Sequence, residues 1–153
     1  MYHSSGKVHF EPEDFEEAVQ DFGVHFSLTN PISKTEEYSL VALYRGGLPL
    51  GVRLSNQFNL TLSIVDYQRL DGDSSEPAFI KNIVKSDNII LVDDIADEGI
   101  TISRTLEFLK KEFPKKEILV YTIFGNNKKH PSGWKYTFLH HKEWIQFVPW
   151  EGK

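Results

Sequence analysis

Residues 89–101 read Ile-Ile-Leu-Val-Asp-Asp-Ile-Ala-Asp-Glu-Gly-Ile-Thr, and this stretch decides the fold. An apolar run, short enough for a buried strand, ends in two adjacent carboxylates, Asp93 and Asp94. An acidic turn that contains Gly99 follows them, and a helical pattern begins at Thr101. A strand that runs directly into a helix is typical of α/β proteins, so the stretch predicts that class.

The same stretch offers two kinds of binding group to a ligand. Adjacent carboxylates accept hydrogen bonds from diol hydroxyls, or share a divalent cation with them. Free backbone N–H groups at the start of the helix bind a phosphate, assisted by the helix dipole. Together these groups suit a sugar phosphate. The alternative is that Asp97 only caps the helix and that the acidic pair is a solvated strand end.

Strands and helices alternate on both sides of this stretch. Apolar periodicity predicts strands at 38–44, 60–67, 88–92 and 117–124, a short strand at 136–139, and helices at 11–22, 49–58 and 101–113. Segment 68–82 is polar and rich in turn residues, which indicates a long mobile loop. The alternation predicts a mostly parallel central sheet flanked by helices, with ligands bound at the carboxyl ends of its strands.

The bulk properties narrow the class of protein. The 153 residues are most simply a single domain spanning 1–153, and their net charge of −5 disfavours a nucleic-acid binder. The absence of cysteine excludes disulfides and thiolate metal sites. No apolar run reaches the ~20 residues that a membrane span needs. Because residues 1–10 also lack the apolar core of a signal peptide, we expect a cytoplasmic protein.

A second glycine-containing turn, Arg45-Gly46-Gly47, follows the strand predicted at 38–44. Two glycines allow the backbone to approach a ligand closely, and Arg45 adds a fixed positive charge. Taken alone, this is equally well a plain turn between a strand and a helix. Taken with the acidic stretch, it predicts a sugar phosphate that carries another phosphate group.

Three segments carry a resemblance to a known family. Residues 91–101 resemble the phosphoribosyl-pyrophosphate signature of type I phosphoribosyltransferases, and residues 43–49 are similar to the pyrophosphate-binding loop of that family. Residues 144–151, Trp-Ile-Gln-Phe-Val-Pro-Trp-Glu, resemble the C-terminus of bacterial xanthine-guanine phosphoribosyltransferases, which act on 6-oxopurines. The similarity runs in matching order from about 38 to 151. It implies a Rossmann-like fold with a small C-terminal hood.

The resemblance implies how the substrate's sugar and phosphates are held. Asp93 and Asp94 would hold the ribose hydroxyls of phosphoribosyl pyrophosphate, with Mg²⁺ bridging from these carboxylates to the pyrophosphate. The turn that would bind the 5-phosphate consists of Asp97, Glu98, Gly99, Ile100 and Thr101. The turn that would hold the departing pyrophosphate consists of Arg45, Gly46 and Gly47.

The resemblance also implies a site for the base. Trp144 would stack on the base, the backbone at Ile145 would meet its exocyclic edge, and Asp97 would lie near N7. The purine-selecting lysine of the family normally follows the Ile-Phe-Gly step directly. Here Asn126 and Asn127 follow that step, and Lys128 is our preferred substitute. The residues implied in catalysis are Arg45, Asp94 and Asp97.

The activity implied is transfer of the 5-phosphoribosyl group to guanine, xanthine or hypoxanthine in purine salvage, by a homo-oligomer (dimer or tetramer). Glu98 stands where the family usually has threonine, so its carboxylate should point away from the phosphate. That departure and the shifted lysine favour an alternative, a non-catalytic phosphoribosyl-pyrophosphate- or nucleotide-binding regulatory protein of the same fold. A transferase for a different base is a further alternative.

Other interpretations of the acidic strand end fit poorly. A nucleoside triphosphatase would need an upstream G-x-x-x-x-G-K-[ST] loop, which the sequence does not contain. A receiver-type phosphoacceptor would carry its acidic pair after the first strand. The six histidines, including the adjacent His140 and His141, show no spacing or supporting acid that indicates zinc.

Overall fold

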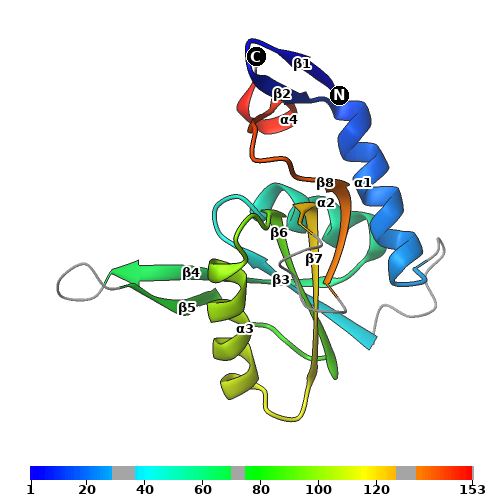
Figure 1. Cartoon of the computed structure of the whole chain (residues 1–153). Coiled ribbons are helices and arrows are strands. Elements are labelled where there is room, and N and C mark those ends of the chain that lie inside the picture. The colour runs from blue at the N-terminus through cyan, green and yellow to red at the C-terminus, as the bar shows by residue number, and fades with distance from the viewer. Residues whose placement is uncertain (29–36, 70–74, 127–133, 153) are drawn as a thin grey trace.

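The computed structural model describes residues 1–28, 37–69, 75–126 and 134–152 (Figure 1). The described helices are α1 (Pro12–His25), α2 (Leu48–Phe58), α3 (Ile100–Glu112) and α4 (Val148–Glu151). The described strands are β1 (Tyr2–Ser4), β2 (Lys7–Phe10), β3 (Tyr38–Leu43), β4 (Thr61–Arg69), β5 (Ser75–Lys81), β6 (Asn88–Ile95), β7 (Glu117–Gly125), β8 (Trp134–Leu139) and β9 (Trp144–Phe147). No helix in these ranges is long and apolar enough to cross a membrane.

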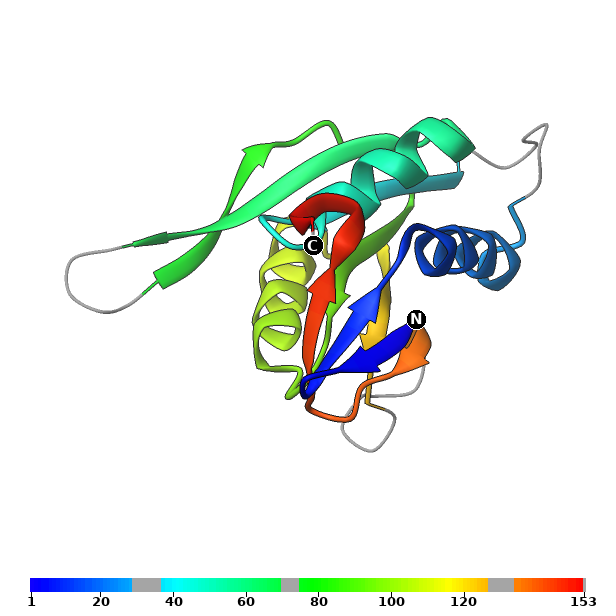
Figure 2. The same ribbon diagram turned by 90° about the horizontal axis from the view of Figure 1, so that it is seen from above.

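The main sheet has six strands in the order β5-β4-β3-β6-β7-β8. All neighbouring pairs are parallel except β4 with β5. The central strands β3 and β6 alternate their side chains between two buried clusters, which is why residues 40–43 of β3 and 89–92 of β6 are apolar on both faces of the sheet. Helices α1 and α2 cover one face, and α3 covers the other (Figure 2). The predicted α/β class with a mostly parallel sheet is confirmed.

The prediction of a long loop at 68–82 was wrong for residues 68–69, which end β4, and for residues 75–81; residues 70–74 lie outside the described residues. Residues 75–81 form β5, an edge strand paired with β4. Figures 1 and 2 show this pair of strands projecting from the rest of the molecule. Pro77 reads as a strand breaker, but an edge strand tolerates proline because it lacks a partner on one side. Phe79 anchors the strand by packing on Phe108 of α3, with ring centroids 5.4 Å apart.

A small second sheet in the order β1-β2-β9 forms the hood. We expected the hood from the C-terminal end alone, but the N-terminal hairpin supplies two of its three strands, and β2 runs parallel to β9 (Figure 2). Phe10 joins the hood to the main sheet, since its ring packs against Phe147 at 5.3 Å and Phe124 at 5.7 Å. The hood therefore lies over the end of the main sheet where β7 finishes.

Candidate functional site

Two turns meet at the carboxyl edge of the main sheet. The turn at 44–47 follows β3, and the acidic turn follows β6, the strand beside it. A Cβ atom on Gly47 would lie 2.5 Å from the carbonyl oxygen of Val92, and one on Gly46 would lie 2.5 Å from Asp94 Oδ2. The two glycines are therefore needed first of all for contact with β6. This packing sets Arg45 and Gly46 beside the acidic pair.

The two adjacent carboxylates are half-buried and hydrogen-bonded to the backbone of β6. Asp93 Oδ1 accepts from the amide of Asp94 at 2.9 Å, and Asp94 Oδ1 accepts from the amide of Ile95 at 2.7 Å. Burial, together with the charge of Asp94, raises the pKa of Asp93 well above its ordinary value. Burial also raises the pKa of Asp94, and the negative charge of Glu151 in α4 contributes to the rise. Hydroxyl donors or a cation bound at the pair would stabilise the ionised carboxylates and so offset the cost of burying their charge.

A cleft of about 650 Å³ opens between these turns and the hood. Its volume lies within the ~300–1,000 Å³ that is usual for small-molecule sites. Its lining residues are Arg45, Gly46, Pro49, Asp94, Ile95, Asp97, His140, Glu143, Trp144, Ile145, Phe147, Trp150 and Glu151. Charged groups from the sheet edge thus face aromatic and apolar groups from the hood across one space.

Six of the predicted site residues line this one cleft. They are Arg45, Gly46, Asp94, Asp97, Trp144 and Ile145. Trp144 is 66% exposed and Ile145 is 6% exposed, so the indole can cover a ligand while the isoleucine anchors β9. Gly47 is buried behind the cleft. Lys128 lies outside the described residues.

The other predicted residues lie on an adjoining cavity of about 540 Å³ at the start of α3. It is lined by Asp93, Ile95, Ala96, Asp97, Glu98, Gly99, Ile100, Thr101 and Ile102. Gly99 adopts a left-handed φ of +78°, a conformation that glycine adopts without strain, and it turns the chain from β6 into the helix. The unpaired N–H groups of the first helical turn lie at this cavity.

Two contacts support this turn that were not predicted from the sequence. The hydroxyl of Tyr67 on β4 donates to the carbonyl oxygen of Thr101 at 2.9 Å and so braces the first turn of α3. Lys142 Nζ lies 3.8 Å from Glu98 Oε1, so a cation from the segment that leads into the hood faces the unusual carboxylate. Its charge partly offsets the negative charge that Glu98 brings to the turn.

His140 is a residue of the cleft that sequence reasoning missed. Its side chain is 7% exposed, and Nε2 lies 3.8 Å from Asp97 Oδ1. The histidines lack the spacing of a zinc site, so their pattern did not single out His140. Its position directly after β8 could have indicated a site residue, because residues that follow a parallel strand lie at the ligand-binding edge of the sheet.

Comparisons with known proteins agree with this geometry. The chain resembles a purine phosphoribosyltransferase from Pyrococcus horikoshii, with 23% identity, a TM-score of 0.71, and coverage of 95% of this chain and 94% of that one. It also resembles the xanthine-guanine-hypoxanthine phosphoribosyltransferase of Helicobacter pylori, with 21% identity, a TM-score of 0.74, and coverage of 97% and 93%. At these identities the likeness shows the fold.

A sequence relative is the ribose-phosphate pyrophosphokinase of Mycoplasma genitalium, 31% identical over 84 residues. These residues make up 54% of this chain and 25% of the relative, so the chain spans about a quarter of that protein's length. The family model of the phosphoribosyl transferase domain matches residues 10–151, which include both turns, β9 and α4. The chain belongs to the phosphoribosyl transferase domain family.

Proposed function

We propose that this protein transfers the 5-phosphoribosyl group of phosphoribosyl pyrophosphate to a 6-oxopurine and releases pyrophosphate. The observation that carries the proposal is the single cleft of about 650 Å³ that joins Arg45 and Asp94 at the sheet edge to Trp144 of the hood. A cation, carboxylates and an exposed indole are the groups that a pyrophosphate, a sugar and a flat base require.

The sugar phosphate fits the acidic turn. Asp93 and Asp94 would accept hydrogen bonds from the two ribose hydroxyls. The 5-phosphate would lie in the cavity at the start of α3, where backbone N–H groups and the hydroxyl of Thr101 donate to it and the helix dipole favours its charge. Tyr67 would hold this turn in place through its bond to the Thr101 carbonyl.

The pyrophosphate fits the turn that contains Arg45 and Gly46. The donor set nearby also suits Mg²⁺, which proteins commonly hold with one or two carboxylates together with substrate phosphates. Asp93 and Asp94 supply those carboxylates, and within the described ranges no group of three or more His, Asp or Glu residues could hold a metal ion by itself. When bound, the ion would stabilise the charge of the leaving pyrophosphate.

The reaction asks the protein for alignment more than for covalent chemistry. A ring nitrogen of the base forms a bond to C1 of the ribose as the bond from C1 to the pyrophosphate oxygen breaks. The carboxylates beside the ribose stabilise the positive charge that develops on the sugar ring, and Arg45 stabilises the departing anion. Trp144 would hold the base over C1, and Asp97 would accept the proton at N7 of the base. Burial under the hood would limit hydrolysis of the sugar.

A panel of bases tests the proposal. The protein is incubated with phosphoribosyl pyrophosphate, Mg²⁺ and each of guanine, xanthine, hypoxanthine, adenine and uracil, and nucleotide formation is followed by chromatography. We expect nucleotide from the 6-oxopurines and none from the Asp94→Asn variant. Nucleotide from adenine or uracil alone would support a transferase for a different base.

The same panel tests the non-catalytic alternative. If no base yields nucleotide while phosphoribosyl pyrophosphate or a nucleotide still binds in calorimetry, the protein is a binding protein of this fold. Glu98 is the observation that favours this alternative, because a carboxylate in the phosphate turn repels the substrate. The ion pair with Lys142 at 3.8 Å favours activity, because it offsets that charge.

A further inference from the structure

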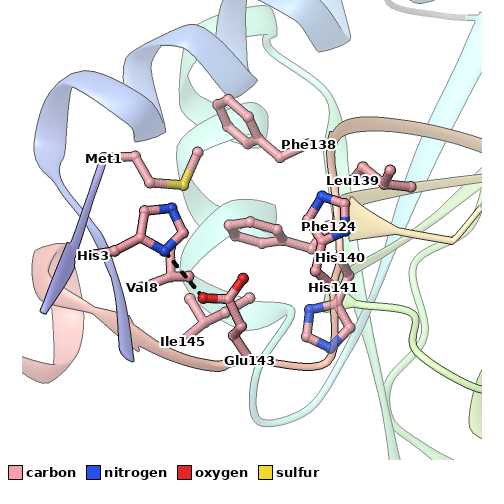
Figure 3. A pocket seen from close by; sticks show the side chains of 10 residues that line it. All are labelled: Met1, His3, Val8, Phe124, Phe138, Leu139, His140, His141, Glu143 and Ile145. Atoms are coloured by element: carbon pink, nitrogen blue, oxygen red, sulfur yellow. Dashed lines mark hydrogen bonds and ion pairs between the residues drawn. The ribbon is translucent and has the colours of Figure 1, made fainter. Parts of the chain in front are cut away.

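His140 occupies a fixed position in the wall of the cleft that Trp144 and Ile145 also line. It follows β8 directly, and its backbone amide donates to the carbonyl oxygen of Gly125 at 2.8 Å. Its ring packs edge-on against Phe124, with centroids 6.4 Å apart. Figure 3 shows the two side chains together at a smaller cavity of about 240 Å³, which shares His140, Glu143 and Ile145 with the main cleft. The imidazole is therefore a built part of the wall.

Asp97 faces this imidazole with an unused oxygen. Asp97 Oδ1 is buried and has no hydrogen-bond partner among the described residues. Its distance of 3.8 Å to His140 Nε2 is too long for a hydrogen bond. The Asp97 side chain as a whole is 41% exposed and lines the cleft, so a donor group on a bound ligand would satisfy the oxygen that lacks a partner.

The two groups, 3.8 Å apart, are close enough to meet neighbouring positions on one edge of a purine. N7 and the substituent at position 6 lie side by side on that edge, and in a free base that carries its proton on N7 they offer one donor and, in a 6-oxopurine, one acceptor. A carboxylate facing Nε2 favours the proton on that nitrogen, which makes Nε2 a donor. With Asp97 at N7, His140 lies beside position 6.

We propose that His140 recognises the base, donating a hydrogen bond from Nε2 to the oxo group at position 6. This inference rests on the proposed function and names the residue that selects the base. A 6-oxopurine offers an acceptor to the imidazole, whereas adenine would set its amino group against the N–H of the ring. Selection by such a mismatch is strong, because a donor is left unpaired in a buried site.

Nucleotide binding tests the inference independently of turnover. Inosine 5′-monophosphate and purine riboside 5′-monophosphate, which lacks any group at position 6, are titrated calorimetrically into the wild type and three variants. His140→Leu should lower the affinity for inosine monophosphate about tenfold, because only one hydrogen bond is lost. The affinity for purine riboside monophosphate should not change. His140→Gln, which retains a donor, should restore most of the affinity. His141→Leu, at the exposed neighbouring histidine, should affect neither nucleotide.

Two results would overturn the inference. If His140→Leu loses affinity equally for both nucleotides, the histidine only supports the structure of the hood. If it loses affinity for neither nucleotide, the histidine does not contact the base. Both differ from failure of the proposed function, which would appear as absence of turnover with every base in the wild type.

Discussion

The contact between Gly46 and the acidic pair leads to a prediction that separates function from stability. In Gly46→Ala, the added Cβ would lie 2.5 Å from Asp94 Oδ2 and 2.7 Å from Oδ1. Real Cβ atoms essentially never come within 3.0 Å of a neighbour, so the carboxylate must move. The side chain can rotate away, and Gly46 has no positive φ that alanine would resist. The fold should therefore survive while the sugar site is displaced.

The size of the effect follows from what moves. A shift of a positioning group by ~1 Å costs about 100-fold in rate, so kcat/KM for phosphoribosyl pyrophosphate should fall about 10- to 100-fold. The free energy of unfolding should fall by only about 1 kcal/mol, the worth of the hydrogen bond between Asp94 and the Ile95 amide. Steady-state kinetics and urea unfolding measure the two quantities.

Gly47→Ala is the matched control. Its Cβ would lie 2.5 Å from the carbonyl oxygen of Val92 and 2.8 Å from that of Leu43, and these backbone atoms of two buried strands cannot move separately. We expect a loss of about 3 kcal/mol in the free energy of unfolding. Wild-type kinetics in Gly46→Ala would refute the placement of the sugar at Asp94. Equal destabilisation by both variants would refute the distinction between side-chain and backbone contacts.

Two further predictions concern the charges of the site. Because burial raises the pKa of Asp93 well above its ordinary value of 3.8, the folded state binds more protons than the unfolded state between about pH 4 and the raised pKa. The free energy of unfolding should therefore fall as pH rises through that raised pKa, and Asp93→Asn should flatten the fall in urea titrations; an unchanged slope would contradict the assignment. Glu98→Thr should lower KM for phosphoribosyl pyrophosphate, because it removes a negative charge from the phosphate turn, and Lys142→Met should raise it. Stability should change little in either variant, since the ion pair is exposed; an unchanged KM in both would remove Glu98 from the phosphate site.

The parts of the fold that the sequence predicted are those with local patterns. Apolar runs and helical spacing in β3, β6, α2 and α3 lie within single segments, so periodicity alone located them to within a few residues. The acidic motif of β6 is equally local. Its contact with Gly46 was expected only because parallel strands bring their carboxyl ends to one edge.

The parts that were missed depend on partners far along the chain. In the hood, Val8 pairs with Ile145 across most of the sequence, and nothing local in residues 7–10 reveals such a partner. The edge strand β5 was hidden by Pro77, whose tolerance depends on where the strand lies in the sheet. His140 was missed because the feature that singles it out is its proximity to Asp97, and only the folded chain brings these two residues together.

The most direct test of the account is the reaction itself. Wild-type protein is mixed with phosphoribosyl pyrophosphate, hypoxanthine and Mg²⁺, and both products are quantified over time. We expect inosine monophosphate and pyrophosphate in equal amounts, and we expect Asp94→Asn to abolish turnover while it leaves the fold unchanged. Absence of nucleotide from hypoxanthine and from the other 6-oxopurines, in protein that is folded and binds phosphoribosyl pyrophosphate, would contradict it.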